Sequence, residues 1–444
     1  MELFERLRNV AVVGAAGKMG SGISLLLAEQ IAFAALEDRA GTHVLNLIDI
    51  SDEGLLGLLR YIRAQAVKTA EKQINRLRRL YAERADLVEN GEMVAEFVHE
   101  VMLHIRTGKT LELARDSHLV FEAAFERDEL KIDIFRKLAD MCGQSTFFLT
   151  NTSAIPIGFL SRESGLEGRV IGYHFYNPPA VQKLVELITP AHCSPGLVAL
   201  ASELATRLGK TIVPANDIAG FIGNGHFMRD GLHGLGEAER LAGEMGFVQA
   251  VWAVDRVSRD WLLRPMGIFQ LIDYVGIDVF QLILSVMRRH IPAPELRSDL
   301  IDLLIELGVK GGQTSSGAQK DGFFRYEKGR PVAVYDPNRR EYVPCEPEGW
   351  CRQVEEALGP HPDPSVSWKA LGRDRDKDAR LRAFFARVKE STTLGCDLAR
   401  RYAAASRAAA EQLVAMGVAA RPEDVNSVLT LGFFHLYGPI NEYL

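Results

Sequence analysis

The sequence predicts an α/β fold, in which a Rossmann-like doubly wound sheet with a helical excursion is followed by two repeated all-α domains. Two observations carry this prediction. Short β-branched runs alternate with helical patterns up to about residue 215, as they do in parallel sheets with crossover helices. From Asn216 to Leu307 only helical patterns continue, and part of this region recurs near the C-terminus.

The first elements form a βαβ unit around a glycine-rich turn. The apolar run 10–13 is followed by the glycine-rich segment 14–20 and then by apolar residues at helical spacing. A second apolar run, 44–48, ends at Asp49. This order predicts strand, turn, helix and a second, parallel strand, joined by the usual right-handed crossover.

A long helical excursion interrupts the sheet. Residues 52–106 contain no proline and place apolar residues at helical spacing throughout, so we expect helices there. Further helices are expected at 128–141 and from the Ser194-Pro195 pair, where serine caps and proline takes the first turn. The strands expected after the excursion are 118–121, 146–150, 169–175 and 184–188.

One internal repeat relates two parts of the helical region at a constant offset of 171 residues. Met245-Gly246 recurs as Met416-Gly417, residues 254–257 as 425–428, and Gly267 as Gly438. We expect each copy to bury an apolar face against the other. The expected domains are a sheet domain 1–216 with its excursion 52–106, a helical domain 217–312, a glycine-rich linker and hairpin 313–345, and a second helical domain 346–444.

Composition excludes several classes of protein. The 444 residues have room for about three domains, and 47% hydrophobic with 25% charged residues is typical of globular proteins. A net charge of -6 supplies no broad positive field for nucleic acid. Five cysteines without a CxxC pair disfavour a disulfide scaffold and a metal site. The N-terminus does not resemble a signal peptide, and no apolar run reaches the ~18 residues of a membrane span, so we expect a cytoplasmic protein.

The glycine turn is a candidate dinucleotide site. Gly14, Gly17 and Gly20 let backbone N–H groups and a helix N-terminus approach a pyrophosphate, with Lys18 and Met19 between them. Asp49 can accept hydrogen bonds from ribose hydroxyls and would repel a 2′-phosphate, which favours NAD over NADP. The GxxGxxG spacing is one residue longer than the common GxGxxG, and a turn that only packs helix on strand is the alternative.

Four ordered motifs further along the chain are more specific. They are Asn-Thr-Ser-Ala-Ile-Pro at 151–156, Gly-Tyr-His-Phe-Tyr-Asn-Pro at 172–178, Val-Gln-Lys-Leu-Val-Glu at 181–186 and Gly-Phe-Ile-Gly-Asn at 220–224. Together with Pro-Met-Gly at 265–267, they resemble the L-3-hydroxyacyl-CoA dehydrogenase family. The likeness runs over most of the chain, and the second helical copy resembles that family's repeated C-terminal domain.

The resemblance assigns a role to each polar residue of these motifs. His174 would be the catalytic base and Glu186 its carboxylate partner, while Ser153 and Asn224 would hydrogen-bond the substrate oxygen. Elementary chemistry agrees, because oxidation of an alcohol removes the hydroxyl proton as hydride leaves the same carbon, and imidazole is a suitable base. We expect Asp49, Ser153, His174 and Glu186 to gather at the carboxyl ends of strands.

Three further residues are implied as cofactor contacts. Glu126 and Lys131 resemble positions near the nicotinamide end of the cofactor, and Asn151 joins the cofactor-binding set. For Glu126 a structural role is equally open, because acidic residues favour the N-terminus of a helix. Ser153 and Asn224 alone could likewise be cap or turn residues.

The helical excursion is the most basic stretch of the chain. Within it, Arg60, Arg63 and Lys68 are candidates for binding the phosphates of CoA, and the family places its acyl-CoA against the corresponding helices. The alternative is a solvated helix face. The basic residues of segment 55–84 of the excursion are Arg60, Arg63, Lys68, Lys72, Arg76, Arg78, Arg79 and Arg84.

The chain also departs from the family pattern. After Asn224 it continues with Gly225-His226 where the family usually has Arg, and nothing resembles a fused hydratase domain, so a separate enoyl-CoA hydratase is expected. Two other functions stay open: an NAD-dependent dehydrogenase of a free hydroxy acid, and a non-catalytic dinucleotide-binding protein. The second helical copy is expected to cover a face that single-copy relatives bury by dimerising, which leaves a monomer or a homodimer.

Overall fold

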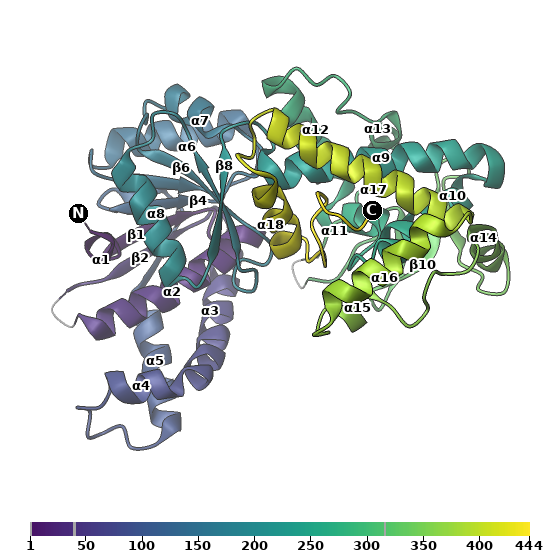
Figure 1. Ribbon diagram of the computed structural model, residues 1–444. Helices are drawn as coiled ribbons and strands as arrows, with labels where there is room; N and C mark the ends of the chain where they lie inside the picture. Colours follow the sequence, from purple (N-terminus) through teal and green to yellow (C-terminus); the bar gives the residue numbers. More distant parts are fainter. Residues whose placement is uncertain (1, 39–40, 315–316) are drawn as a thin grey trace. The chain divides into compact units, whose positions relative to one another are not determined.

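The computed structural model describes residues 2–38, 41–314 and 317–444, which form two compact units (Figure 1). The first unit spans Met1–Asp217 and the second Ile218–Leu444. The first is built around a sheet and the second mainly from helices. This is the fold class that the sequence predicts. The finer division of the second unit at residues 312 and 345 stays a prediction.

An eight-stranded sheet forms the core of the first unit, in the order β3-β2-β1-β4-β5-β6-β7-β8. All neighbouring strands pair in parallel except β6 and β7, which are antiparallel. The strands are β1 (Asn9–Val13), β2 (Val44–Ile48), β3 (Ile105–Gly108), β4 (Leu119–Glu122), β5 (Phe147–Thr150), β6 (Val170–Phe175), β7 (Leu184–Thr189) and β8 (Thr211–Asn216).

The reversed direction of β7 corrects one expectation. Glu186 was expected at the carboxyl end of its strand, but it lies near the start of β7. The connection from β6 to β7, residues 176–183, is too short for the dozen or more residues that a parallel crossover needs. The chain therefore turns back, and the start of β7 meets the end of β6.

Helices flank this sheet because its strands are apolar on both faces, as in other parallel sheets. The longest of the helices that pack on the strands is α2, which has the length and mean hydropathy (1.5) of a membrane span, but 72% of that window is buried inside the protein. It is a core helix of the sheet unit. The helices of this unit are α1 (Leu3–Arg6), α2 (Lys18–Glu37), α3 (Asp52–Lys72), α4 (Ile74–Leu80), α5 (Asn90–Leu103), α6 (Asp128–Met141), α7 (Ile157–Glu163), α8 (Pro195–Arg207) and the short 3-10 helix η1 (Leu111–Ala114).

The excursion consists of three helices, and α3, α4 and α5 extend away from the sheet in Figure 1. The prediction of helix up to residue 106 was wrong at its end, because residues 105–108 form the edge strand β3. This strand is short and alternates little, so its sequence carries no strong strand signal. Ser51 caps α3 by accepting a hydrogen bond from the Gly54 backbone N–H at 2.9 Å. Leu55, Leu58 and Ile62 bury one face of α3.

The second unit contains helices and one small sheet. Where a hairpin was expected at 323–343, the structure has a three-stranded antiparallel sheet in the order β11-β10-β9. The elements are α9 (Phe221–Met245), α10 (Phe247–Arg256), the π-helix η2 (Val257–Trp261), α11 (Ile268–Val275), α12 (Ile277–His290), α13 (Asp299–Glu306), β9 (Phe324–Glu327), β10 (Arg330–Asp336), β11 (Glu341–Pro344), α14 (Trp350–Leu358), α15 (Trp368–Leu371), α16 (Lys377–Glu390), α17 (Leu394–Ala415) and α18 (Pro422–Gly432).

The repeat found in the sequence has a counterpart in the hydrogen bonds. Asp255 Oδ1 accepts from the Phe269 N–H at 3.0 Å, and at the same offset Asn426 Oδ1 accepts from the Ile440 N–H at 3.1 Å. Gly267 and Gly438 lie directly against these two side chains, where a Cβ atom would collide with them. The matching glycines are therefore explained by the same close contact in both copies.

The departure from the family at Gly225-His226 lies where the two copies pack together. A Cβ atom at Gly225 would approach a methyl group of Leu413, on α17, to 2.8 Å. His226 Nε2 lies 3.1 Å from the carbonyl oxygen of Ser406, also on α17. Both residues are thus suited to close packing of α9 against α17.

Candidate active site

The glycine turn fits the pyrophosphate of a dinucleotide. Gly14 has φ +77°, and a Cβ there would lie 2.7 Å from the Ala123 carbonyl oxygen, so only glycine suits the position. Gly20 packs directly against Gly14. Helix α2 begins at Lys18 with Gly17 as its N-cap, no side chain caps it, and its first turn, which includes Met19, carries no acid. Its positive end can therefore face an anion.

Asp49 follows β2 and is tied to this turn. Its Oδ2 accepts a hydrogen bond from the Ala16 N–H at 2.9 Å, and its Oδ1 accepts from the Ser51 N–H at 3.2 Å. These contacts hold the carboxylate beside the glycine turn, at the carboxyl end of β2. A carboxylate at this edge can accept hydrogen bonds from ribose hydroxyls.

His174 and Glu186 face each other across the antiparallel pair of strands. They are direct cross-strand partners in the register of β6 and β7, and His174 Nδ1 lies 2.9 Å from Glu186 Oε2. Because a carboxylate only accepts hydrogen bonds, Nδ1 carries the proton, which makes Nε2 the basic nitrogen of the neutral ring. Glu186 is fully buried and the His174 side chain is 10% exposed.

A third residue, Tyr176, joins this pair, and it was not among the predicted site residues. The Tyr176 hydroxyl donates a hydrogen bond of 2.6 Å to Glu186 Oε2, the oxygen that also holds His174. The Tyr176 and His174 rings lie 4.9 Å apart between centroids. The signal was available, because side chains two positions apart in an extended chain point to the same side.

Ser153 lies in a loop that is fixed by Glu126. The Oε1 atom of Glu126 accepts hydrogen bonds from the Thr152 hydroxyl at 2.6 Å, the Ser153 N–H at 2.9 Å and the Ala154 N–H at 3.0 Å. The Ser153 hydroxyl itself lies 3.4 Å from the same oxygen. Glu126 therefore positions the loop after β5 and does not simply open α6, whose first residue is Asp128.

Lys131 lies beneath this loop. Its side chain is 1% exposed, and its Nζ donates to both carboxylate oxygens of Glu122 at 2.8 and 2.9 Å and to the Ala124 carbonyl at 3.1 Å. It also forms an ion pair with Glu126 at 3.4 Å. Burial alone would lower the pKa of Lys131, but the two carboxylates raise it, so the ammonium stays charged. These contacts give Lys131 a supporting position under Glu126.

The two asparagines lie in different units. Asn151 follows β5, and its Oδ1 accepts a hydrogen bond from the Phe175 N–H at 2.9 Å, which ties the Ser153 loop to the end of β6. Asn224 lies in the first turn of α9 in the helical unit. Sheet-unit residues that the structure brings to one edge are thus Asn151, Ser153, His174 and Glu186.

The predicted CoA residues lie on the outer face of α3. Arg60, Arg63 and Lys68 are exposed, and in the part of the chain that the structure describes none of them forms an ion pair. Other basic residues of the excursion do have carboxylate partners. Arg76 lies 2.8 Å from Glu37, and Arg84 pairs with two carboxylates. Among the described residues, these three are therefore exposed cations without a carboxylate partner.

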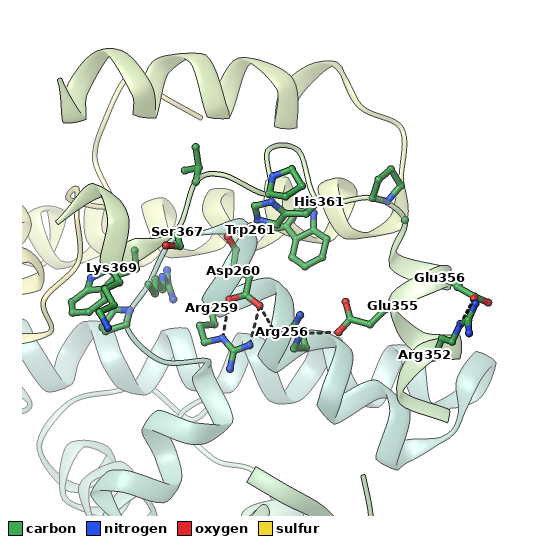
Figure 2. A pocket seen from close by; sticks show the side chains of 17 residues that line it. Arg256, Arg259, Asp260, Trp261, Arg352, Glu355, Glu356, His361, Ser367 and Lys369 are labelled. Atoms are coloured by element: carbon green, nitrogen blue, oxygen red, sulfur yellow. Dashed lines mark hydrogen bonds and ion pairs between the residues drawn. The ribbon is translucent and has the colours of Figure 1, made fainter. Parts of the chain in front are cut away.

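A separate hollow of about 810 Å³ lies in the helical unit, between η2, α14 and the segment 359–369 (Figure 2). Figure 2 shows Arg256 and Arg259 joined to acids: Arg256 lies 2.8 Å from both Asp260 and Glu355, and Arg259 lies 2.9 Å from Asp260. These pairs satisfy the charges locally. None of the sequence-predicted site residues lines this hollow.

Comparison with known proteins now decides the family. The family model for the NAD-binding domain of 3-hydroxyacyl-CoA dehydrogenase matches residues 9–218, and the model for the C-terminal domain of the same enzyme matches residues 235–321. The chain belongs to the 3-hydroxyacyl-CoA dehydrogenase family. It is an NAD-dependent oxidoreductase, and the glycine turn is part of its NAD-binding domain. The resemblance read from the four motifs is confirmed.

Individual relatives agree. A probable 3-hydroxybutyryl-CoA dehydrogenase of Deinococcus radiodurans is 31% identical over 212 residues, which cover 48% of this chain and 72% of the relative. A probable 3-hydroxybutyryl-CoA dehydrogenase of Bacillus subtilis is 29% identical over 328 residues, 72% of this chain and 98% of the relative. This dehydrogenase therefore carries additional sequence beyond the region shared with the B. subtilis protein.

A solved structure covers nearly the whole chain. The crystal structure of 3-hydroxybutyryl-CoA dehydrogenase from Escherichia coli superposes with a TM-score of 0.64 at 24% identity, over 98% of this chain and 90% of that one. At this identity the likeness shows the fold. Within residues 2–38, 41–314 and 317–444, no group of three or more His, Cys, Asp or Glu side chains is arranged to hold a metal ion.

Proposed function

We propose that this dehydrogenase catalyses the reversible, NAD-linked oxidation of L-3-hydroxyacyl-CoA to 3-oxoacyl-CoA, in fatty acid β-oxidation or related acyl-CoA metabolism. The observation that supports it is the His174–Glu186 pair at the sheet edge. His174 Nε2 takes the proton of the substrate hydroxyl, and the buried Glu186 stabilises the imidazolium that forms. NAD, when bound, supplies the hydride acceptor.

Ser153 and Asn224 are proposed to hydrogen-bond the substrate oxygen, as the family resemblance implies. The Ser153 loop is already fixed through Glu126, so this donor would need little rearrangement when the substrate binds. Preorganised donors of this kind stabilise the charge that develops on oxygen in the transition state.

A spectrophotometric assay tests this proposal and separates it from the alternatives. Purified protein is mixed with NAD and L-3-hydroxybutyryl-CoA, or with NADH and acetoacetyl-CoA, and the absorbance of the reduced cofactor is followed. Turnover of free L-3-hydroxybutyrate at a higher kcat/KM than the CoA ester would instead show a dehydrogenase of a free hydroxy acid. NADH binding without turnover of either substrate would show a non-catalytic dinucleotide-binding protein.

We further propose that the outer face of α3 binds the phosphates of CoA through Arg60, Arg63 and Lys68. The triple charge reversal R60E/R63E/K68E should raise the KM for acyl-CoA at least about tenfold, since it replaces attraction of phosphate by repulsion. The KM for NAD should stay unchanged. The matched control R373E/R375E/K389E changes the net charge equally on exposed residues of the helical unit, and an equal rise in KM there would contradict the proposal.

The proposal also includes the partners and the location of the enzyme. A separate enoyl-CoA hydratase would supply the substrate, and the enzyme would act in the cytoplasm as a monomer or homodimer. Because the second helical copy packs on the first through α17 and α9, it is proposed to cover a face that single-copy relatives bury by dimerising. Light scattering that finds an obligate dimer through this face would contradict that part.

A further inference from the structure

The carboxylate of Glu186 is shared between two donors. His174 Nδ1 lies 2.9 Å from Oε2, and the Tyr176 hydroxyl lies 2.6 Å from the same atom. An O–H···O⁻ hydrogen bond of this length is charge-assisted and among the stronger ones in proteins. Glu186 is 0% exposed, so its charge is stabilised by these neighbours much more than by water.

Tyr176 is a donor over the whole working pH range. Burial raises the pKa of its hydroxyl well above the ordinary value, and the charge of Glu186 raises it further. Its proton therefore remains on the phenol and stays available to the Glu186 oxygen. Tyr176 withdraws part of the negative charge that would otherwise act on the imidazole.

We propose that Tyr176 is a positioning residue that tunes the basicity of His174 by sharing the Glu186 oxygen on which the imidazolium depends. This inference rests on the proposed function, in which His174 is the base. A carboxylate that already accepts a strong hydrogen bond stabilises an adjacent cation less. The Tyr176 hydroxyl thus keeps His174 unprotonated, and competent as a base, to lower pH.

The elements packed around β6 and β7 carry their charged side chains on faces turned away from the sheet. The neighbouring strands β5 and β8 carry no ionisable side chain. The helices that pack on β6, β7 and β8 are α7 and α8, and they bury Leu, Ile, Ala and Ser side chains against the sheet. Their charged residues lie on the outward faces, and these are Arg162, Glu163, Glu203 and Arg207.

The test is the pH profile of kcat/KM for the full-length protein with NAD and L-3-hydroxybutyryl-CoA. The variant Tyr176→Phe removes only the hydroxyl, and we expect the acidic limb of the profile to move up by about 0.5 to 1 pH unit. Below the limb, activity then falls by about three- to tenfold relative to the native protein, while the plateau kcat changes little. A loss of kcat that is equal at every pH, with the limb in place, would overturn the proposal.

Tyr173→Phe is the matched control. Tyr173 is fully buried on β6, and within the described residues its hydroxyl has no hydrogen-bond partner. Its removal deletes a neighbouring buried hydroxyl without touching Glu186, so the limb should stay in place. An equal displacement of the limb in both variants would show a general effect of packing and would refute the specific role of Tyr176.

A second readout does not depend on turnover. The ring carbon signal of His174, assigned by its loss in His174→Gln, is titrated by NMR in protein labelled at histidine Cε1. The midpoint should rise in Tyr176→Phe, and this rise should vanish when Glu186→Gln is added, since the effect passes through that carboxylate. If the native protein shows no turnover, the proposed function fails. If it turns over but neither the limb nor the midpoint moves in Tyr176→Phe, this inference alone fails.

Discussion

Two buried carboxylates, Asp230 in the helical unit and Glu186 in the sheet unit of this dehydrogenase, have partners of different chemistry. In the helical unit, Asp230 accepts from Arg264 at 2.7 and 3.3 Å, and the Tyr402 hydroxyl lies 3.3 Å from it. At the edge of the sheet, Glu186 faces an imidazole. A guanidinium never gives up its proton at working pH, whereas an imidazole titrates near neutrality.

The difference separates structural charges from chemical ones. Burial alone would raise the pKa of Asp230, but Arg264 holds it at about 2, so this pair keeps one charge state at every working pH. The His174–Glu186 pair can exist in two states, with the proton on or off His174. Burial of a charge therefore does not by itself identify an active site, whereas a partner that can change its charge state allows proton transfer.

The largest expected effect is at the titratable pair. His174→Gln should lower kcat by ~10² to 10⁴ because it removes the base. Glutamine can still donate to Glu186, so the melting temperature and the Kd for NADH should stay close to native values. Steady-state kinetics measures kcat, NADH titration measures the Kd, and thermal denaturation measures the melting temperature.

His99→Gln is the control, since His99 is exposed on α5, and its kcat should not change. An equal loss of NADH affinity in His174→Gln would indicate that His174 has a structural role, and the comparison between the two kinds of buried charge would fail.

At the structural pair the expected loss is in stability. Arg264→Met leaves Asp230 buried without its cation and should lower the free energy of unfolding by about 3 to 5 kcal/mol. The kcat of the folded fraction should stay within roughly threefold of native. Urea denaturation followed by circular dichroism measures the first quantity. The double variant D230L/R264M should recover part of the stability, because it removes both charges.

A fall in kcat by two orders of magnitude in fully folded Arg264→Met protein would mean that this pair also serves catalysis. The chemistry of the partner would then not distinguish the Asp230–Arg264 pair from the His174–Glu186 pair.

The sequence predicted the roles of His174 and Glu186 from their separate motifs and missed contacts that depend on tertiary pairing, including that of Tyr176 with Glu186. His174 and Glu186 were identified because each ends an apolar run in a recognisable motif. The direction of β7 was not predicted, because it depends on the length of the connection between β6 and β7. The burial of Lys131 between Glu122 and Glu126 was not predicted either, because nothing local reports that a lysine on α6 reaches β4.

The same distinction holds for the fold. The strand, glycine turn and helix of residues 9–37 were predicted because each has a strong local signal. The excursion 52–106 was read as helical to its end, since periodicity alone does not show where a turn divides it or where β3 begins. The repeat was found because its glycines are fixed by close contacts with Asp255 and Asn426, which tolerate no other residue.

A smaller effect is expected from Asp273, whose carboxylate forms no ion pair with a cation within the described residues. Its carboxylate accepts from the Phe323 and Phe324 N–H groups at 2.7 and 2.9 Å and from the Tyr326 hydroxyl at 2.9 Å. Burial nevertheless raises its pKa to about 8. Between about pH 4 and pH 8 the folded chain holds a proton that the unfolded chain has released, so stability falls as pH rises, by up to about 1.4 kcal/mol per unit.

Asp273→Asn should remove this slope, which urea denaturation at pH 6, 7 and 8 would measure. The difference between the native and variant curves isolates this residue from other groups that titrate in the same window. Parallel curves would show that Asp273 is ionised in the folded protein at neutral pH, and that the backbone N–H groups replace a cation as fully as Arg264 does for Asp230.

The smallest effect is expected from exchanging the equivalent residues of the two copies. Asp255 accepts hydrogen bonds from the N–H groups of Phe269 and Gln270 and from the Gln270 side chain, and burial raises its pKa. Asp255→Asn gives the first copy the side chain that the second copy already has at the equivalent position, Asn426. The amide oxygen of the new asparagine can still accept from the backbone N–H groups, and the Gln270 amide can turn so that its oxygen accepts from the new NH₂ group. The cost of burying a charge is also removed, so the free energy of unfolding should change by less than about 1 kcal/mol. A loss several times larger, measured by the same denaturation, would mean that the negative charge itself holds the first copy together, as in the Asp230 pair, and that the second copy is maintained by a different balance of forces.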